Sequence, residues 1–323
     1  MDVAVIAGIV MIISVVVMLV MGVPIGISIG MSSALAMITI LPFGPGIVTC
    51  AQKMFTGVNS FSLLAIPFFI LAGNIMNNGG IAIRLVNCAR LISGRLPGSL
   101  AQTNIVANML FGAISGSGTA AAAAIGGTMA PIELEEGYDK DYVAAVNIAS
   151  APTGQLIPPS NTLIVYATVA GSVSVAALFM AGYIPGIAWG ISLMFIAGYM
   201  AKKRGYVSTF SVTPKEALKV LWDALPSLLL IIIVIGGILK GVFTATEGSA
   251  IAVVYALILS LCYRSLKIKD LPSIILSSCK TTCIVIFMIG VSSIMSWVMA
   301  YTMIPTAIAN AMLSLSSNKY VIL

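Results

Sequence analysis

Two short polar segments interrupt apolar stretches of this chain, and both can supply oxygen ligands. The first, Phe111–Thr119 (FGAISGSGT), carries the hydroxyl groups of two serines. The second, Gly154–Asn161 (GQLIPPSN), contains two consecutive prolines, whose missing N–H groups leave upstream carbonyl oxygens free. Hydroxyl and carbonyl oxygens at such breaks coordinate dehydrated hard cations such as Na⁺. We therefore expect a first Na⁺ site formed by Ser115, Ser117, Gly154, Ile157 and Pro158.

The same two segments also predict a site for an anion. A helix that begins near Thr119 directs its free N–H groups, and the positive end of its dipole, into the space between the segments. A carboxylate is the most obvious partner for such a helix end. The predicted substrate-binding residues are Ser117, Gly118, Thr119, Ser160 and Asn161.

Enzyme chemistry finds little support in the residues. The chain has no histidine, which excludes a Ser-His-Asp arrangement, and it lacks phosphate-loop and dinucleotide fingerprints. A catalytic Ser–Lys pair would need a lysine within the membrane. Only Lys240 is close to the membrane, and it lies near a helix end, from which its charged group can reach the membrane surface. The five cysteines form no CxxC pair, so a transition-metal site is not expected. We predict a non-enzyme without an organic cofactor.

The composition places these segments in an all-α polytopic membrane protein. Of the 323 residues, 59% are hydrophobic and only 8% are charged, which is too little polar surface for a water-soluble globule. The apolar residues form long runs of the length that crosses a bilayer as helix. The net charge of +6 comes from scattered loop residues, so nucleic acid is not an expected partner.

Lysine and arginine gather in three clusters, around Arg84–Arg95, Lys202–Lys219 and Arg264–Lys280. The positive-inside rule puts all three in the cytoplasm, so an even number of crossings must separate them. This parity requires that 97–131 enters and leaves on one side, as a re-entrant helical hairpin, and it places the N-terminus outside the cytoplasm. The alternative for 97–131 is a helix-packing face, which Gly112-x3-Gly116 also fits.

The proline pair predicts that Tyr142–Ala170 is two half-helices with an unwound centre at 154–161. The alternative is a kinked helix without a functional role. A third polar break follows at Gly241–Glu247, where Glu247 is either functional or a helix cap. Thr213 is expected to cap a short amphipathic helix. Small residues at Gly182, Gly186 and Gly190 predict close helix packing.

Four segments resemble the large membrane subunit of tripartite ATP-independent periplasmic (TRAP) transporters. They are SFSLLAIPFFILAGNIM (60–76), GRLPGSLAQTNIVANMLFGAISGSG (94–118), APTGQLIPPSNTLIVY (151–166) and GVFTATEGSAIAVVYAL (241–257). The similarity covers nearly the whole chain, and the SGSG, IPPS and FTxTE segments are together highly specific to this family. Leu64–Ile92 and Cys283–Asn318 also echo one another as inverted copies, a pattern found in transporters.

The resemblance implies an inverted-repeat, elevator-type transporter that imports an organic acid by Na⁺ symport, a form of secondary active transport. It implies three partners besides membrane lipid: a soluble periplasmic binding protein that delivers the substrate, a small four-helix membrane subunit, and the organic anion itself (sialic acid, a sugar acid or a dicarboxylate). The expected location is the bacterial inner membrane. A second, partial Na⁺ site falls on Gly241 and Thr244. Sialic-acid members carry an aspartate where this chain has Ala121.

The resemblance also implies an organisation for the chain. Residues 1–60 are expected to be scaffold helices, 61–170 the first repeat of the transport domain, and 171–280 scaffold and connecting helices. Residues 281–323 would begin a second repeat that is cut short before its hairpin. Two alternatives stay open at this point: an ion-coupled carrier that needs no binding protein, and a non-transporting, truncated membrane scaffold.

Overall fold

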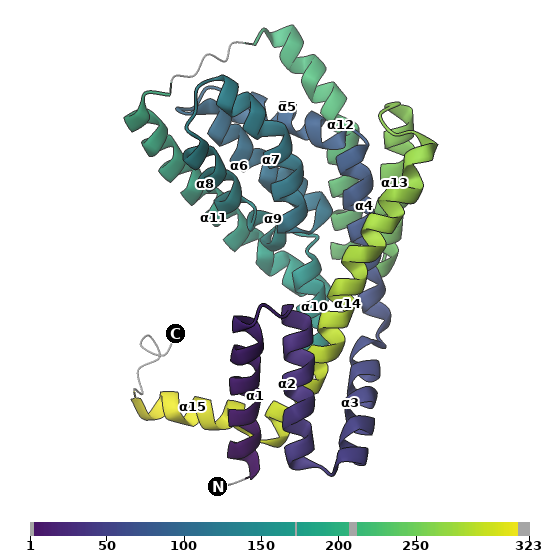
Figure 1. Cartoon of the computed structure of the whole chain (residues 1–323). Helices are drawn as coiled ribbons and strands as arrows, with labels where there is room; N and C mark the ends of the chain where they lie inside the picture. The colour runs from purple at the N-terminus through teal and green to yellow at the C-terminus, as the bar shows by residue number, and fades with distance from the viewer. Residues whose placement is uncertain (1–2, 172, 207–211, 316–323) are drawn as a thin grey trace. The chain divides into compact units, whose positions relative to one another are not determined.

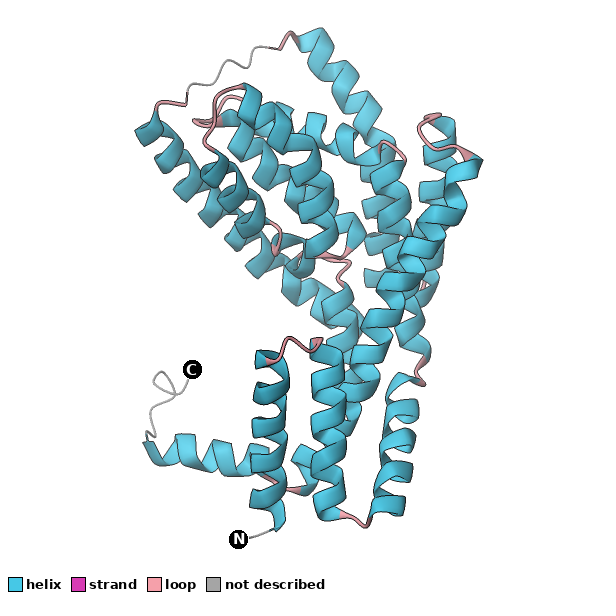
Figure 2. Ribbon diagram, in the orientation of Figure 1, coloured by secondary structure: helices cyan, strands magenta, loops and turns pink. Residues whose placement is uncertain are grey.

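The computed structural model describes residues 3–171, 173–206 and 212–315, and regular structure in these ranges is helical throughout (Figures 1 and 2). Two compact units are present. One combines Met1–Ser60 with Thr281–Leu323, and the other is the continuous segment Phe61–Lys280. Both polar breaks predicted to form the first site lie in the second unit.

The first unit contains three N-terminal helices together with the C-terminal part of α14 and a final helix, α15. Their bounds are α1 Val3–Val20, α2 Ile25–Ile40, α3 Phe43–Val58, α14 Leu271–Tyr301 and α15 Ile304–Leu315. Its core is an apolar cluster of α1, α2 and α14 side chains: Ala7, Met11, Ala36, Met37, Ile294 and Val298.

The second unit is built from shorter helices followed by three long ones. Their bounds are η1 Phe61–Leu64, α4 Ala65–Asn78, α5 Ile81–Ser93, α6 Ser99–Ser115, α7 Gly118–Glu135, α8 Lys140–Ser150, α9 Thr153–Leu156, α10 Asn161–Ala170, α11 Val175–Arg204, α12 Pro214–Leu239, α13 Ala245–Cys262 and η2 Ile268–Asp270. Within this unit α6 packs against α5, α7, α8, α9 and α11. It is buried along almost its whole length, so it forms the centre of the unit.

Six helical segments of the described chain are long and apolar enough to cross a membrane. They are Val3–Val20, Phe61–Asn78, Val175–Arg204, Pro214–Leu239, Ala245–Cys262 and Ile268–Tyr301. Their outer faces are apolar as well: Ile184 and Phe195 of α11 are 78% and 76% exposed. Apolar side chains in such numbers are stable on a surface that faces lipid. The prediction of a polytopic all-α membrane protein is confirmed.

Two helices run further than the sequence predicted. The short amphipathic helix and the following span form one helix, α12, which continues through Pro226, and α7 continues past Pro131 to Glu135. A proline removes one backbone hydrogen bond, a loss that membrane helices tolerate. The predicted start at Thr213 is confirmed: its hydroxyl accepts from the Glu216 N–H, and the Glu216 carboxylate accepts from the Thr213 N–H.

Small residues bring α11 into close contact with its neighbours, as the glycine spacing predicted. A Cβ on Gly182 would lie 2.5 Å from the Leu156 carbonyl oxygen, and one on Gly190 would lie 2.3 Å from the Met109 sulfur. A Cβ on Gly186 would meet Ile157 at 2.6 Å. No side chain fits at these three positions without displacement, so α11 holds the end of α9 closely.

Candidate functional site

The first predicted break lies between α6 and α7. Gly116 ends α6 in the left-handed conformation (φ +64°), and its N–H donates to the Gly112 carbonyl at 2.9 Å. Ser117 is extended, and its hydroxyl accepts from the Ala120 N–H at 3.3 Å, which caps α7. A glycine that tolerates positive φ followed by a capping serine is a local signal for a helix end and a helix start. The helix–break–helix is confirmed.

The second predicted break separates α9 from α10. The backbone leaves the helical conformation at Ile157 (φ −78°, ψ 122°), directly before the two prolines. Ser160 caps α10 because its hydroxyl accepts from the Leu163 N–H at 3.3 Å, and the same hydroxyl donates to the Gln155 carbonyl. An unwound centre is therefore present, but at 157–160 rather than over the predicted 154–161, because Gly154–Leu156 belong to α9 and Asn161 begins α10.

The two breaks lie directly against each other. The Asn161 N–H donates to the Gly116 carbonyl oxygen at 3.1 Å, which joins the start of α10 to the break between α6 and α7. One turn earlier the backbones touch, since a Cβ on Gly112 would lie 2.2 Å from the Cα of Gly154. Gly112-x3-Gly116 is therefore a packing face as well as part of a break, and the re-entrant course of 97–131 in the membrane stays a prediction.

Most residues predicted for the first cation site are brought together by this contact. The Ser115 hydroxyl lies 3.4 Å from the Ser117 carbonyl oxygen, and a Cβ on Gly154 would lie 3.4 Å from the same oxygen. Ile157 and Pro158 follow Gly154 at the end of α9 and are buried. Buried hydroxyl and carbonyl oxygens around the ends of α6 and α9 are suited to a hard cation.

The predicted substrate-binding residues occupy the N-termini of α7 and α10. Ser117, Gly118 and Thr119 begin α7, and the Thr119 hydroxyl is exposed and 3.0 Å from that of Ser117. Ser160 and Asn161 begin α10, and the Asn161 Oδ1 is buried without a hydrogen-bond partner in the described part of the chain. Two adjacent helix N-termini suit a carboxylate, because both present N–H groups and positive dipole ends.

Gly112 was singled out by its spacing and Ala121 by the resemblance, but neither was predicted as a ligand of the site. Gly112 provides the closest backbone approach, and its signal was the GxxxG spacing itself. Ala121 is fully buried, and its methyl group lies 3.3 Å from the Cβ position of Gly154. Nothing local marks Ala121 in a run of alanines, since its place follows from the packing of α7 on α9.

The predicted second cation residues lie in the turn between α12 and α13. Gly241 has φ +70°, and its N–H donates to the Ile238 carbonyl at 3.1 Å. The Thr244 hydroxyl lies 2.9 Å from the Glu247 carboxylate, whose other contact is the Thr244 N–H at 2.7 Å. This reciprocal pair is a capping box, so Glu247 acts as a helix cap here. The Thr246 hydroxyl donates to the Phe61 carbonyl at 3.3 Å and ties the turn to η1.

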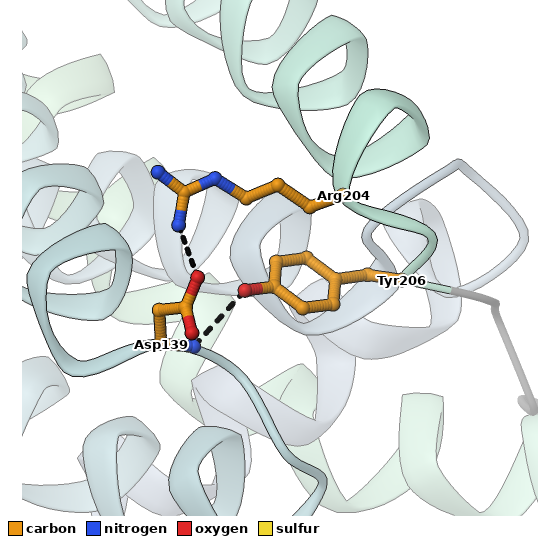
Figure 3. A network of polar contacts seen from close by, with 3 residues as sticks. All are labelled: Asp139, Arg204 and Tyr206. Atoms are coloured by element: carbon orange, nitrogen blue, oxygen red, sulfur yellow. Dashed lines mark hydrogen bonds and ion pairs between the residues drawn. The ribbon is translucent and has the colours of Figure 1, made fainter.

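A polar cluster surrounds the other end of α7. Asp139 forms an ion pair with Arg204, the last residue of α11, and its N–H donates to the Tyr206 hydroxyl at 3.0 Å (Figure 3). The Tyr206 ring stacks on Tyr138, with 4.2 Å between centroids. Nearby Glu133 is fully buried, and burial raises the pKa of its carboxyl to about 7 despite a hydrogen bond from Asn104 that lowers it.

Comparison with known proteins identifies the family. Residues 12–323 match the model of the tripartite ATP-independent periplasmic transporter, DctM component. The chain is 52% identical over 293 residues to the uncharacterized protein YgiK of Salmonella typhimurium, covering 91% of this chain and 67% of that protein. It is 38% identical over 291 residues to the sialic acid TRAP transporter large permease protein SiaM of Vibrio cholerae, covering 90% of this chain and 68% of that protein.

A third relative is the C4-dicarboxylate TRAP transporter large permease protein DctM of Rhodobacter capsulatus, 36% identical over 282 residues, with 83% of this chain and 64% of that protein covered. The chain thus spans about two thirds of the length of these relatives. A family match over nearly all residues agrees with the two adjoining breaks and the apolar helices. The chain belongs to the DctM component family of TRAP transporters.

Proposed function

We propose that this chain acts as the large membrane subunit of a Na⁺-coupled secondary transporter that imports an organic acid. The contact between Gly116 and Asn161 carries this proposal, because it joins two interrupted helices at one point. Interrupted helices supply transporters with both the carbonyl oxygens that bind the coupling ion and the N-termini that bind the substrate.

The ion is Na⁺, held by Ser115, Ser117, Gly154, Ile157 and Pro158. Ser115 and Gly154 are buried, so water competes little for the cation once it is bound. The second site at Gly241 and Thr244 receives weaker support, because the Thr244 hydroxyl is engaged by Glu247.

The substrate is a carboxylate bound at the starts of α7 and α10. Relatives are named for sialic acid, for C4-dicarboxylates and, in Escherichia coli, for 2,3-diketo-L-gulonate, all of which are organic acids. The methyl group of Ala121 faces Gly154 and brings no charge to the site, so binding of the acid depends on helix ends and on Asn161.

The partners follow from the family. A periplasmic binding protein delivers the acid, a small membrane subunit completes the scaffold, and the moving part operates as an elevator in the inner membrane. The N-terminus is periplasmic, in accord with the three basic clusters. Substrate moves only when Na⁺ fills its site, which couples uptake to the gradient.

The test is uptake into proteoliposomes that contain this chain with its small subunit and binding protein. The binding protein is first screened by thermal shift against sialic acid, succinate and gluconate, and the acid that binds is used as the radiolabelled probe. We expect uptake that requires an inward Na⁺ gradient. Equal uptake without Na⁺ contradicts the proposal, uptake indifferent to binding protein indicates an independent carrier, and no uptake indicates a non-transporting scaffold.

A further inference from the structure

The far end of α7 holds a carboxyl group that the proposed transport site does not use. Glu133 has no exposed surface, although it lies near the end of its helix. Within the described residues no basic side chain lies within ion-pair distance, and its one hydrogen-bond donor is the Asn104 Nδ2, at 3.4 and 3.5 Å from the two oxygens. A buried carboxylate with a single weak donor is unfavourable, whereas the neutral acid is not.

Asn104 connects this carboxyl group to a ladder of buried amides. The Asn104 Oδ1 accepts from the Asn108 Nδ2 at 2.8 Å, and Asn108 reaches across to α8. There its Nδ2 lies 2.9 Å from the Ser150 hydroxyl and 3.2 Å from the Asn147 Oδ1. The Asn104–Asn108 ladder therefore links α7, α6 and α8 through side chains in the interior.

Asn108 cannot satisfy all of its neighbours at once. Its Nδ2 carries two hydrogens but lies within hydrogen-bond distance of four acceptors, the fourth being the Asn104 carbonyl at 3.1 Å. Its Oδ1 is buried without a partner in the described part of the chain. Turning this amide over satisfies its oxygen only if the Asn104 amide turns with it, because the Asn108 oxygen would otherwise face the Asn104 Oδ1. The coupled turn withdraws a donor from Ser150, so the ladder has two arrangements.

The ladder ends beside the candidate cation site. The Ser150 carbonyl accepts from the Thr153 hydroxyl at 2.6 Å, and Thr153 directly precedes Gly154. Asn147 also donates to the Ala122 carbonyl on α7 at 3.0 Å. Gly126 leaves room for it, since a Cβ there would lie 2.2 Å from the Asn147 Nδ2. The position of α9 thus depends on contacts that lead back to Glu133.

We propose that Glu133 is a proton-binding site whose occupancy selects the arrangement of the Asn104–Asn108 ladder and thereby the cation affinity at the two breaks. The part about cation affinity rests on the proposed function. The ionised carboxylate requires the Asn104 N–H, which leaves the Asn104 oxygen to accept from Asn108. When Glu133 takes up one proton from water, the neutral acid donates its O–H to the Asn104 Oδ1 in place of Asn108. Asn104 then presents its N–H to the free Asn108 oxygen, and Ser150 loses its donor.

Two tyrosines and two charged side chains are the other titratable groups near Glu133. Tyr138 from the following loop and Tyr142 from α8 face it, and burial raises the pKa of both phenols above their usual values. Glu136 and Arg90 line a pocket of about 220 Å³ with Tyr138 at this end of α7. Arg204 lies 5.4 Å from the Tyr142 ring centroid.

The first experiment is infrared titration of the full chain in detergent. We expect a protonated-carboxyl band that disappears as the pH rises through about 7, is absent in Glu133→Gln, and persists in Glu135→Gln, an exposed neighbour on the same helix. Absence of a Glu133-dependent band between pH 5 and 9 overturns the proposal. This readout needs neither Na⁺ nor partners, so it is independent of the proposed function.

The second experiment measures Na⁺ affinity by thermal shift at pH 6 and pH 8. We expect wild type to bind Na⁺ about fivefold more tightly at pH 8, at the lower end of typical couplings between sites. Glu133→Gln and Asn104→Ala should lose this pH dependence, whereas Glu135→Gln should keep it. Equal pH dependence in wild type and Glu133→Gln overturns the coupling. An absence of Na⁺ binding at both pH values contradicts the proposed function and the coupling, but leaves the proton site to the infrared result.

Discussion

At the scale of single residues, two serine hydroxyls are the proposed cation ligands most accessible to a test. Ser115→Ala combined with Ser117→Ala should raise the Na⁺ concentration for half-maximal uptake about tenfold, since two oxygen ligands are lost. Removing the Ser117 cap also costs about 1 kcal/mol of stability, so folding must be monitored. Ser192→Ala, at an exposed position of α11, is the control. An unchanged Na⁺ requirement would remove these residues from the site.

Glu133 gives a second prediction at this scale, for how the free energy of unfolding depends on pH. Its pKa is about 7 in the folded chain and about 4.5 when unfolded, so the folded state binds more protons between these values. Stability should therefore be greatest at low pH and fall as the pH rises to about 7, by no more than about 3 kcal/mol. Glu133→Gln should lack this fall in melting temperature, and an identical pH profile in both proteins would contradict the raised pKa.

At the scale of elements, the fold of the hairpin depends on glycine in α6. Gly112→Ala places a Cβ 2.2 Å from the Gly154 Cα, so α6 and α9 must separate. We expect a loss of about 1–3 kcal/mol, as for overpacked cores, together with weaker Na⁺ binding. Gly127→Ala is the matched control, because nothing lies within 4 Å of its Cβ position. If the two variants have equal melting temperatures and Na⁺ affinity, the close approach is not required.

Aromatic stacking contributes more than the ion pair to holding the loop after α7 against the end of α11. The Asp139–Arg204 pair is half-exposed, with side chains 62% and 37% accessible, and such pairs contribute about 0–1 kcal/mol. Tyr206 stacks on Tyr138 and accepts the Asp139 N–H, so Tyr206→Ala should lower the melting temperature more than Arg204→Gln. The reverse order would show that the ion pair dominates.

Helix ends could be predicted from the sequence because their causes are local. Glycine, proline and serine at 116–118 and 157–160 act on neighbouring backbone groups, and both breaks lie where expected. The continuity of α12 through Pro226 could not be predicted, because whether a helix tolerates the hydrogen bond lost at a proline depends on the rest of the helix. The burial of Glu133 could not be predicted either, because it depends on α6 and α8, which no nearby residue indicates.

At the scale of the whole molecule, the two units separate the chain at 60/61 and 280/281. These boundaries coincide with limits expected from the resemblance, although division into scaffold and transport parts stays a prediction. The compactness of a unit does not show which of its helices move during transport. Each unit combines a segment expected to be scaffold with a segment expected to be transport domain, so the membrane orientation of α11 is the more direct quantity to measure.

The orientation of α11 follows from charge and length. Its 30 residues extend about 45 Å, more than the roughly 30 Å of a hydrocarbon core, and its last turn carries Lys202, Lys203 and Arg204. The positive-inside rule places that end in the cytoplasm and Ser174 in the periplasm. In a chain whose five native cysteines are replaced by serine, a membrane-impermeant maleimide should label Ser174→Cys in intact spheroplasts and Lys203→Cys only after lysis. The opposite pattern would invert the topology, and with it the periplasmic placement of the N-terminus.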